Sequence, residues 1–392
     1  GSSVPATVQD VVLARAARLP PASRQVLQLA SIVPGHIERW LVDDLLAAPL
    51  ADLEACLGSG LLQADGGRLE FRHELGRVAI EASLSAPLAQ SLHARVLAAL
   101  TAPGRSSAPA RRVHHAVRAG DTAAISRDAP LAAREAAERG AHREAAAHWR
   151  IALQHGRPAD DDDRREWLEQ SAVEATLLGA IPEALTQRRA LEQLALERGD
   201  IAEAAIQLSR QAMLHIGLMR HDAGDDLNHK ALALLEPLPP GPAHVIVWQM
   251  ECYLRMLNRE CEDSVEWGLR AAGLADALHD GVAAVGVLGA LGTARLFIDY
   301  ERGIAEMQRA LQQQLAAGRL QPAAVTLGNL GSGSGELMHL AGAERWLRES
   351  LALSVANEFD NQAGYCRAWL SLTALLRGRW DEAAALASDV VQ

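Results

Sequence analysis

Ala290-Leu291-Gly292-Thr293, Asn329-Leu330-Gly331-Ser332 and Ser371-Leu372-Thr373-Ala374 are three short segments that align with one another. Leu291 and Leu330 are 39 residues apart, and Leu330 and Leu372 are 42 apart. A break and a second amphipathic segment follow each of them. Helix pairs that recur at such a period are typical of a helical-repeat array, in which each pair buries its apolar face against the next. The second helices are expected around residues 304–315, 346–355 and 380–386.

The same register can be followed toward the N-terminus. Comparable second helices are predicted to begin near His142, Ile181, Asp222 and Glu262, so the array extends back to about residue 105 and contains seven helix pairs. Its segments 140–146 and 378–384 resemble the tetratricopeptide repeat, although a period near 40 exceeds the usual ~34 residues of that repeat. A HEAT-like array is the alternative. Either architecture is a superhelix whose concave face is lined by the first helix of each pair.

Composition supports an all-α fold. Hydrophobic residues make up 49% of the 392 residues but aromatic residues only 4%, and Ala and Leu, which favour helices, supply most of the apolar content. A net charge of -11 argues against nonspecific binding to nucleic acid. Four widely spaced cysteines suggest neither a disulfide framework nor a zinc motif. No apolar stretch is long enough to span a membrane, and a cytoplasmic location is expected.

The first hundred residues have a different pattern. Helices are expected near residues 8–19, 26–33, 37–45 and 50–57, followed by a small β-hairpin that turns at Asp65-Gly66-Gly67. This order predicts a winged-helix domain over residues 1–101 and a repeat domain over residues 102–392. The helix before the hairpin carries Asp52 and Glu54 but no cation, so direct contact with nucleic acid is not expected.

Several segments of the first domain resemble the region that follows the nucleotide-binding module in large ATP-binding LuxR-type regulators. These proteins are relatives of the maltose regulator within the class of signal-transduction ATPases with numerous domains. Related helical regions accompany some adenylate cyclases. The segments that carry the resemblance are Val4–Val12 with Arg15 and Arg18–Pro20, Val26–Ala30, Phe71–Arg77 and Leu92-His93.

The resemblance implies a role for His73. In that class, a winged-helix histidine within a Met-His-Asp pattern contacts the phosphate of bound ADP and holds the resting state. Arg72-His73-Glu74 occupies the corresponding place, with Arg for Met and Glu for Asp. ATP or ADP is thus implied for the intact protein, whereas no cofactor is expected in this chain. It contains no GxxxxGK[ST] phosphate-binding loop and is predicted not to be an enzyme.

Candidate ligand-binding residues lie on the first helices of the later repeats. Asn329, Arg295, Arg367 and Trp369 offer an amide, two charged groups and an aromatic surface for a bound ligand or partner. The alternative is that Trp369 packs between repeats and the arginines are solvated. The run Gly331–Gly335 permits a close helix approach, a kink or a ligand against the backbone. The histidines at 114, 115, 142, 148 and 155 lack metal-site spacing and are interpreted as solvated or capping residues, so no metal site is predicted.

These observations predict a non-catalytic region that binds an effector and relays a signal within an ATP-dependent LuxR-type transcriptional regulator. The expected partner is a small-molecule effector or a regulatory protein, and the resemblance implies self-association of the intact protein. A phosphate-binding loop is expected upstream of residue 4 and a helix-turn-helix downstream of residue 392. The alternatives are an accessory region of a signalling enzyme of the adenylate cyclase type and a plain protein-binding repeat scaffold.

Overall fold

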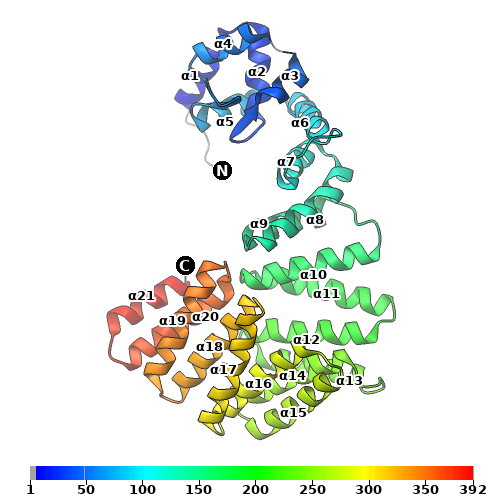
Figure 1. Ribbon diagram of the computed structural model, residues 1–392, viewed down its shortest axis with the longest axis vertical. Coiled ribbons are helices and arrows are strands. Elements are labelled where there is room, and N and C mark those ends of the chain that lie inside the picture. The colour runs from blue at the N-terminus through cyan, green and yellow to red at the C-terminus, as the bar shows by residue number, and fades with distance from the viewer. Residues whose placement is uncertain (1–5, 48, 392) are drawn as a thin grey trace. The chain divides into compact units, whose positions relative to one another are not determined.

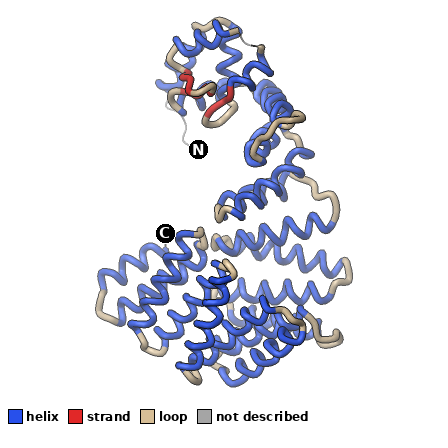
Figure 2. Tube along the Cα trace, in the orientation of Figure 1, coloured by secondary structure: helices blue, strands red, loops and turns tan. Residues whose placement is uncertain are grey.

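The computed structural model describes residues 6–47 and 49–391, which form 21 helices and one three-stranded sheet (Figures 1 and 2). The all-α fold with helical repeats is confirmed. Two compact units divide the chain: Gly1–Arg134 with Arg150–Arg157, and Glu135–Trp149 with Pro158–Gln392. These units are defined by spatial contacts, whereas the predicted division after residue 101 separates repeat from non-repeat sequence and stays a prediction. The residues Val4 and Pro5 of the family resemblance lie outside the described part of the chain.

A small antiparallel sheet lies among the helices of the first unit. The predicted hairpin is formed by β2 (Leu62–Asp65) and β3 (Arg68–Phe71). A third strand, β1 (His36–Glu38), pairs with β3 and gives the strand order β1-β3-β2. The helices of this region are α1 (Ala6–Ala17), α2 (Pro21–Ser31), α3 (Arg39–Leu46), α4 (Leu50–Gly58), α5 (Glu74–Ser83), α6 (Ala86–Leu100) and α7 (Pro109–Ala119).

Ile37 was predicted to belong to the third helix, and this prediction is wrong. Ile37 is a strand residue opposite Leu69, and both side chains are buried in the core of the unit. Helix α3 begins only at Arg39. A short apolar pattern fits a strand as well as the first turn of a helix, and here the pairing with a distant strand decides between them.

Helix α4 has a structural role in this unit. Its Leu53 and Cys56 are buried in the same core, and Asp52 accepts a hydrogen bond of 3.0 Å from the Ser23 hydroxyl on α2. One of the two acidic residues that argued against nucleic-acid contact therefore joins two helices.

Seven successive helix pairs follow α7, from α8/α9 to α20/α21, as the periodicity predicted. Helices α9, α11, α13 and α15 begin at or within one residue of the predicted starts, and from α10 onward the two helices of each pair pack on each other. The helices are α8 (Thr122–Glu138), α9 (His142–His155), α10 (Asp161–Leu177), α11 (Ile181–Glu197), α12 (Ile201–Gly217), α13 (His221–Leu235), α14 (Pro242–Leu257), α15 (Cys261–Ala277), α16 (Gly281–Leu296), α17 (Tyr300–Ala316), α18 (Leu320–Glu336), α19 (Leu340–Ala356), α20 (Asp360–Leu376) and α21 (Trp380–Val391).

The sequence alignment of the last repeat is shifted by two residues. Helices α18 and α20 begin 40 residues apart, at Leu320 and Asp360, so Leu330 corresponds to Leu370 rather than to Leu372. Leu330 and Leu370 are both buried, whereas 42% of Leu372 is exposed. The aligned letters agreed at Leu372, but burial against the second helix of the pair sets the true register.

Glycines let the two helices of a pair approach closely. A Cβ atom on Gly331 would lie 2.5 Å from Leu347 Cγ of α19, and one on Gly303 would lie 2.5 Å from the backbone nitrogen of Leu296. The glycine run 331–335 is buried inside a continuous α18. Of the three explanations left open for that run, close helix approach therefore accounts for Gly331.

Within the described part of the chain, no helix combines the length and the apolar character needed to cross a membrane.

Replacing Gly303 by Ala is expected to destabilise the second unit by about 1–3 kcal/mol, because the added methyl group meets backbone that has little room to move. Gly273→Ala on α15 is the matched control, since no atom lies within 4 Å of its added Cβ. That variant should be more stable by about 0.4–1 kcal/mol, as expected when Gly becomes Ala in an open helix position. Urea unfolding of both variants tests the pair, and equal changes would contradict the packing argument.

Candidate functional site

The first helices of the pairs form an inner layer in the second unit. Helix α14 contacts α12 and α16, and α18 contacts α16 and α20, so that consecutive first helices pack side by side. The second helices pack on these first helices. Helix α10 also contacts α20, which brings the start and the end of the array together (Figure 1). The inner layer therefore curves through a full circuit and surrounds a shared inner surface.

A closure contact joins the two ends of this array; it consists of His142, Arg143 and Gly179 against residues 358–361. The Arg143 guanidinium pairs with Glu358 at 2.9 Å and with Asp360 at 2.8 Å. The backbone N–H of Arg143 donates a further hydrogen bond of 2.9 Å to the Glu358 carboxylate. The Arg143 side chain is 61% exposed, so each ion pair contributes little by itself. The backbone bond and the apolar packing beside it give the contact a defined geometry.

His142 supplies the less exposed part of the closure contact. Its ring packs on Phe359 with the ring centroids 5.5 Å apart, and its Nδ1 lies 2.7 Å from the buried carboxylate of Glu174 on α10. The hydrogen bond to Glu174 raises the pKa of His142 despite the opposing effect of burial, and the negative charges of Glu174 and Glu358 raise it further. Protonation of His142 therefore strengthens this end of the array.

Polar and aromatic side chains meet on the inner layer at α14, α18 and α20. Tyr365 and Trp369 of α20 occupy the register positions of Val325 and Asn329 on α18. These two α18 residues are partly exposed on a helix that is otherwise largely buried. We call Tyr253, Asn329, Ser332, Tyr365 and Trp369 the inner cluster.

Tyr365 interacts with other members of this cluster. Burial is the main reason why the pKa of Tyr365 is raised, and the charge of Tyr253 raises it further, whereas hydrogen bonds with Ser332 and Trp369 lower it. Tyr253 lies on α14, and the first helices α16 and α18 lie between α14 and α20 in the layer. The pKa of Tyr253 is also raised by burial.

The inner cluster can bind neutral hydrogen-bonding groups. Both phenols are protonated at neutral pH, so each hydroxyl can donate and accept. The Asn329 amide offers the same combination, and 38% of the Tyr365 side chain is exposed. Trp369 packs beside Gly335 of α18 and against the core formed by Leu347, Cys366 and Leu370, which leaves it partly exposed. The surface is thus suited to amide groups and apolar side chains.

The structure places two of the four predicted groove residues at equivalent positions of neighbouring first helices. Asn329 and Trp369 share the inner layer, at equivalent register positions. Arg295 is buried against the second helix α17, where it forms an ion pair with Glu306. Arg367 occupies the register position of Leu327, a core residue of the preceding repeat, and is partly exposed. Ligand contact by any of the four stays a prediction.

Sequence reasoning missed Tyr253, Ser332 and Tyr365. A repeat spacing of 40 aligns Tyr365 with the partly exposed Val325 of α18, whereas the assumed spacing of 42 aligns it with the buried Ala323. Tyr253 carries no local signal, because its proximity to Tyr365 follows from the curvature of the whole array.

His73 lies at the start of α5, directly after the sheet. It is exposed, and its side chain forms no capping hydrogen bond to the helix. Its contact with an ADP phosphate concerns the intact protein and stays a prediction.

The interpretation of the clustered histidines as solvated or capping residues is wrong for His115, His142 and His148, the last with only 12% of its side chain exposed. His115 is fully buried, with its Nδ1 2.9 Å from Nδ1 of His93 on α6. His142 is bonded to Glu174 as described above. Sequence spacing did not reveal either arrangement, since both partners lie on other helices.

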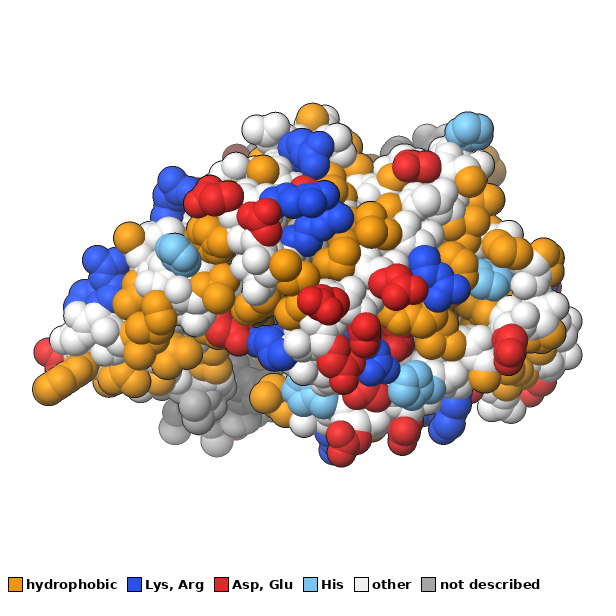
Figure 3. Space-filling model, turned by 90° about the horizontal axis from the view of Figure 1, so that it is seen from below, with side chains coloured by type: hydrophobic (Ala, Val, Ile, Leu, Met, Phe, Trp, Pro, Cys, Tyr) orange, Lys and Arg blue, Asp and Glu red, His pale blue; other side chains and the backbone are white. Residues whose placement is uncertain are grey.

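The surface of the second unit carries mixed charge on the face shown in Figure 3. Acidic and basic side chains are interspersed among hydrophobic ones there. Among the ion pairs of this unit are those of Arg255 with Glu251 and Glu260. Arg270 lies over the rings of Trp248 and Trp267.

Neither a known family profile nor a curated protein matches the sequence. Solved structures with a similar fold include a Rap protein complexed with Competence and Sporulation Factor, with a TM-score of 0.52 and 11% identity over 78% of this chain and 92% of that one. A signal-transduction ATPase with a tetratricopeptide repeat sensor from Pyrococcus horikoshii has a TM-score of 0.38 and 16% identity. That match covers all of this chain but 59% of the other protein. Aspartyl phosphate phosphatase F from Bacillus subtilis has a TM-score of 0.37 and 12% identity, over 78% of this chain and 89% of that one.

The likeness to the Rap protein concerns the fold alone. It agrees with the helix pairs described above and supports an all-α repeat superhelix.

The closure contact is expected to weaken as the pH rises. Because the folded protein raises the pKa of His142, the stabilising effect is complete below the ordinary imidazole pKa of about 6.5 and is lost as the pH rises through the higher folded value. Amide exchange at residues 358–361, corrected for its intrinsic pH dependence, should be about tenfold faster near pH 8 than near pH 6, equivalent to about 1.4 kcal/mol. His142→Asn should remove this difference and His155→Asn should retain it. An unchanged difference in His142→Asn would refute the assignment.

Proposed function

We propose that the second unit binds a peptide or an extended segment of a partner protein along its inner layer. The observation that carries the proposal is the inner cluster, in which two phenols, an indole, a hydroxyl and an amide from three first helices share one surface. Tyr and Trp supply large contact areas at low conformational cost, and they dominate the binding energy of many interfaces. No catalytic activity is proposed for this chain.

A polypeptide fits this surface better than a compact charged metabolite. Its backbone presents neutral donors and acceptors at regular intervals, which match neutral phenols and an amide. Leu372 and Leu376 occupy the register positions of Ser332 and Glu336 on α18, and they follow Tyr365 and Trp369 along α20. Both leucines are exposed, at 42% and 47%. Apolar side chains of a bound segment would cover them.

The Rap protein with the similar fold is complexed with Competence and Sporulation Factor. This shows that a superhelix of this kind can hold a signalling factor, and it supports the same class of role for the present chain.

We further propose that binding is relayed to an ATPase in an intact LuxR-type regulator. The support is the resemblance of the first unit to the region after the nucleotide-binding module in those proteins, including His73 at the place of the phosphate-contacting histidine. A ligand can drive such a change only if it binds one arrangement more tightly than the other. The second unit would be closed when the closure contact is formed and open when it is broken. A ligand on the inner layer would bind one of these two arrangements more tightly than the other.

The gene sequence around this chain tests the relay. A phosphate-binding loop encoded upstream and a helix-turn-helix downstream are the expected result. A cyclase or kinase domain there would instead favour an accessory region of a signalling enzyme, and the absence of any catalytic or DNA-binding region would favour a plain protein-binding scaffold.

Peptides selected from a random display library against this chain should bind through the inner cluster. Asn329→Ala and Tyr365→Phe are expected to weaken binding by about tenfold each, equivalent to about 1.4 kcal/mol, because each removes a hydrogen-bonding group from the contact. Fluorescence anisotropy measures the dissociation constants.

The matched controls for this experiment are Gln313→Ala on the exposed side of α17 and Tyr300→Phe, whose ring stacks on His339. Both should bind as the unchanged chain does. Equal effects of control and inner-cluster variants, or a metabolite screen that stabilises the chain while no peptide is selected, would contradict the proposal.

A further inference from the structure

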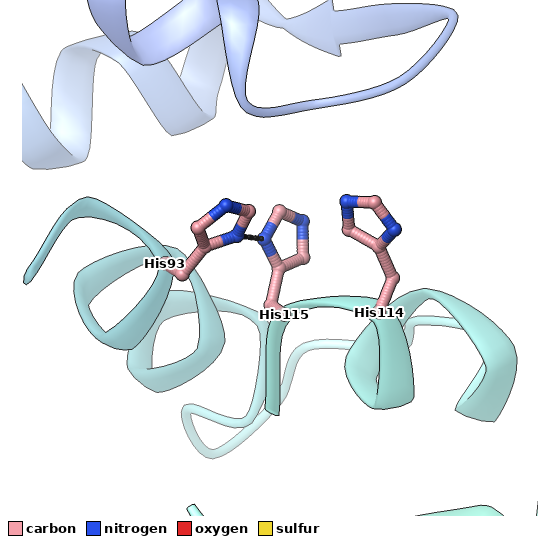
Figure 4. Close-up of side chains that lie close together, drawn as sticks. All are labelled: His93, His114 and His115. Carbon is pink, nitrogen blue, oxygen red and sulfur yellow. Dashed lines mark hydrogen bonds between the residues drawn. The ribbon is translucent and has the colours of Figure 1, made fainter. Parts of the chain in front are cut away.

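Three histidine side chains converge between α6 and α7 of the first unit. His93 lies on α6, while His114 and His115 are consecutive residues of α7 (Figure 4). Each contributes one ring nitrogen to a group in which all three atoms lie within 4.8 Å of one another. His115 stands between the other two rings, and its Nδ1 is 2.9 Å from Nδ1 of His93.

Hydrogen bonding within the protein leaves this group incomplete. His93 and His115 are buried, and His114 is partly buried. The Nε2 atoms of His114 and His115 are shielded from solvent and have no hydrogen-bond partner, whereas the Nδ1 of His114 accepts a hydrogen bond of 3.1 Å from the Arg118 guanidinium. Whichever of His93 and His115 donates in the bond between them, the Nε2 of His115 remains unpaired. Buried polar atoms in folded proteins nearly always have a partner, so the cluster calls for one more group.

The charges around the cluster are balanced by acidic residues. Three arginines lie close enough to lower the histidine pKa values, and each has a carboxylate partner. Arg77 pairs with Glu74 at 2.8 Å and with Glu81 at 2.6 Å. The remaining two pairs are Arg111 with Glu38 at 2.6 Å and Arg118 with Glu81 at 4.0 Å. A cation between the rings would therefore not meet an uncompensated positive field.

The spacing of the ring nitrogens suits a first-row transition metal. Three nitrogens bound to Zn²⁺ at about 2.1 Å in tetrahedral geometry lie about 3.4 Å from one another. One ring nitrogen from each histidine lies within 4.8 Å of the other two, which is close to this spacing. Rotations of the rings about their own side-chain bonds would equalise the three distances without moving the helices.

We propose that His93, His114 and His115 form a binding site for one Zn²⁺ ion, with water in the fourth position. The ion ties α6 to α7 and pairs ring nitrogens that are otherwise unsatisfied. Imidazole ligands also accept Co²⁺, which serves as a spectroscopic probe of the same geometry.

Titration of the metal-free protein, prepared without a histidine tag, tests the proposal. The expected result is one Co²⁺ per chain with the visible absorption of a tetrahedral site, displaced by one equivalent of Zn²⁺, and a higher Tm with Zn²⁺ bound. His114→Gln and His115→Gln should each weaken Zn²⁺ binding by at least about 100-fold, since even the outer partners of metal ligands contribute 10- to 100-fold.

His155→Gln is the matched control, because His155 is an exposed histidine of the same unit that is not part of the cluster. It should bind Zn²⁺ as the unchanged chain does. Circular dichroism verifies that each variant is folded, and His114→Gln decides the outcome if the fully buried His115 does not tolerate replacement. Failure of the unchanged chain to bind Zn²⁺ at stoichiometric concentration overturns the proposal. So does binding that survives His114→Gln, or that falls equally in His155→Gln.

Discussion

Close packing between the two helices of each pair is the constraint on which the second unit depends. Gly331 faces Leu347 and Gly303 faces the backbone of Leu296 at distances that leave no room for a methyl group. This approach brings the first helices into one continuous layer and sets the rotation from each pair to the next. Since the curvature of a repeat array is the sum of such small rotations, the contact between α10 and α20 at the far ends depends on every pair between them.

The closure contact and the inner cluster are two consequences of that curvature. Residues 142–143 and 358–360 are more than two hundred positions apart, yet they share ion pairs, a backbone hydrogen bond and a ring contact. The charge of Tyr253 on α14 also raises the pKa of Tyr365 on α20. A segment bound to the inner layer touches helices from several repeats, and its binding energy depends on how far the array is closed. A repeat scaffold can convert local contacts into a change of curvature in this way, because each pair contributes only a small rotation.

Much of the fold could be predicted because helical periodicity is a local property of the sequence. The seven pairs and the starts of α9, α11, α13 and α15 follow from apolar spacing and from turn residues close by. Two errors arose where distant contacts decide. Ile37 is a strand residue because it pairs with Leu69, and Leu372 is exposed because Leu370 takes the buried position instead. The site was less accessible to sequence reasoning. Asn329 and Trp369 were predicted from their positions within the repeat, and they occupy equivalent positions on α18 and α20. Arg295 was predicted from its charge, but it forms an ion pair with Glu306.

The histidines show why residue spacing alone is a poor guide to chemistry in helical repeats. Neighbouring residues on one helix point about 100° apart, so His114 and His115 by themselves resemble solvated side chains. Only the packing of α6 on α7 adds His93, from 22 positions earlier, and removes water from two of the three rings. This burial leaves the Nε2 atoms of His114 and His115 without partners. A fold that retained such a group with no compensating ligand would bear the full cost of the unsatisfied nitrogens, and apolar side chains of similar size would avoid it. The presence of three histidines at this junction is therefore better explained by a bound group than by packing alone.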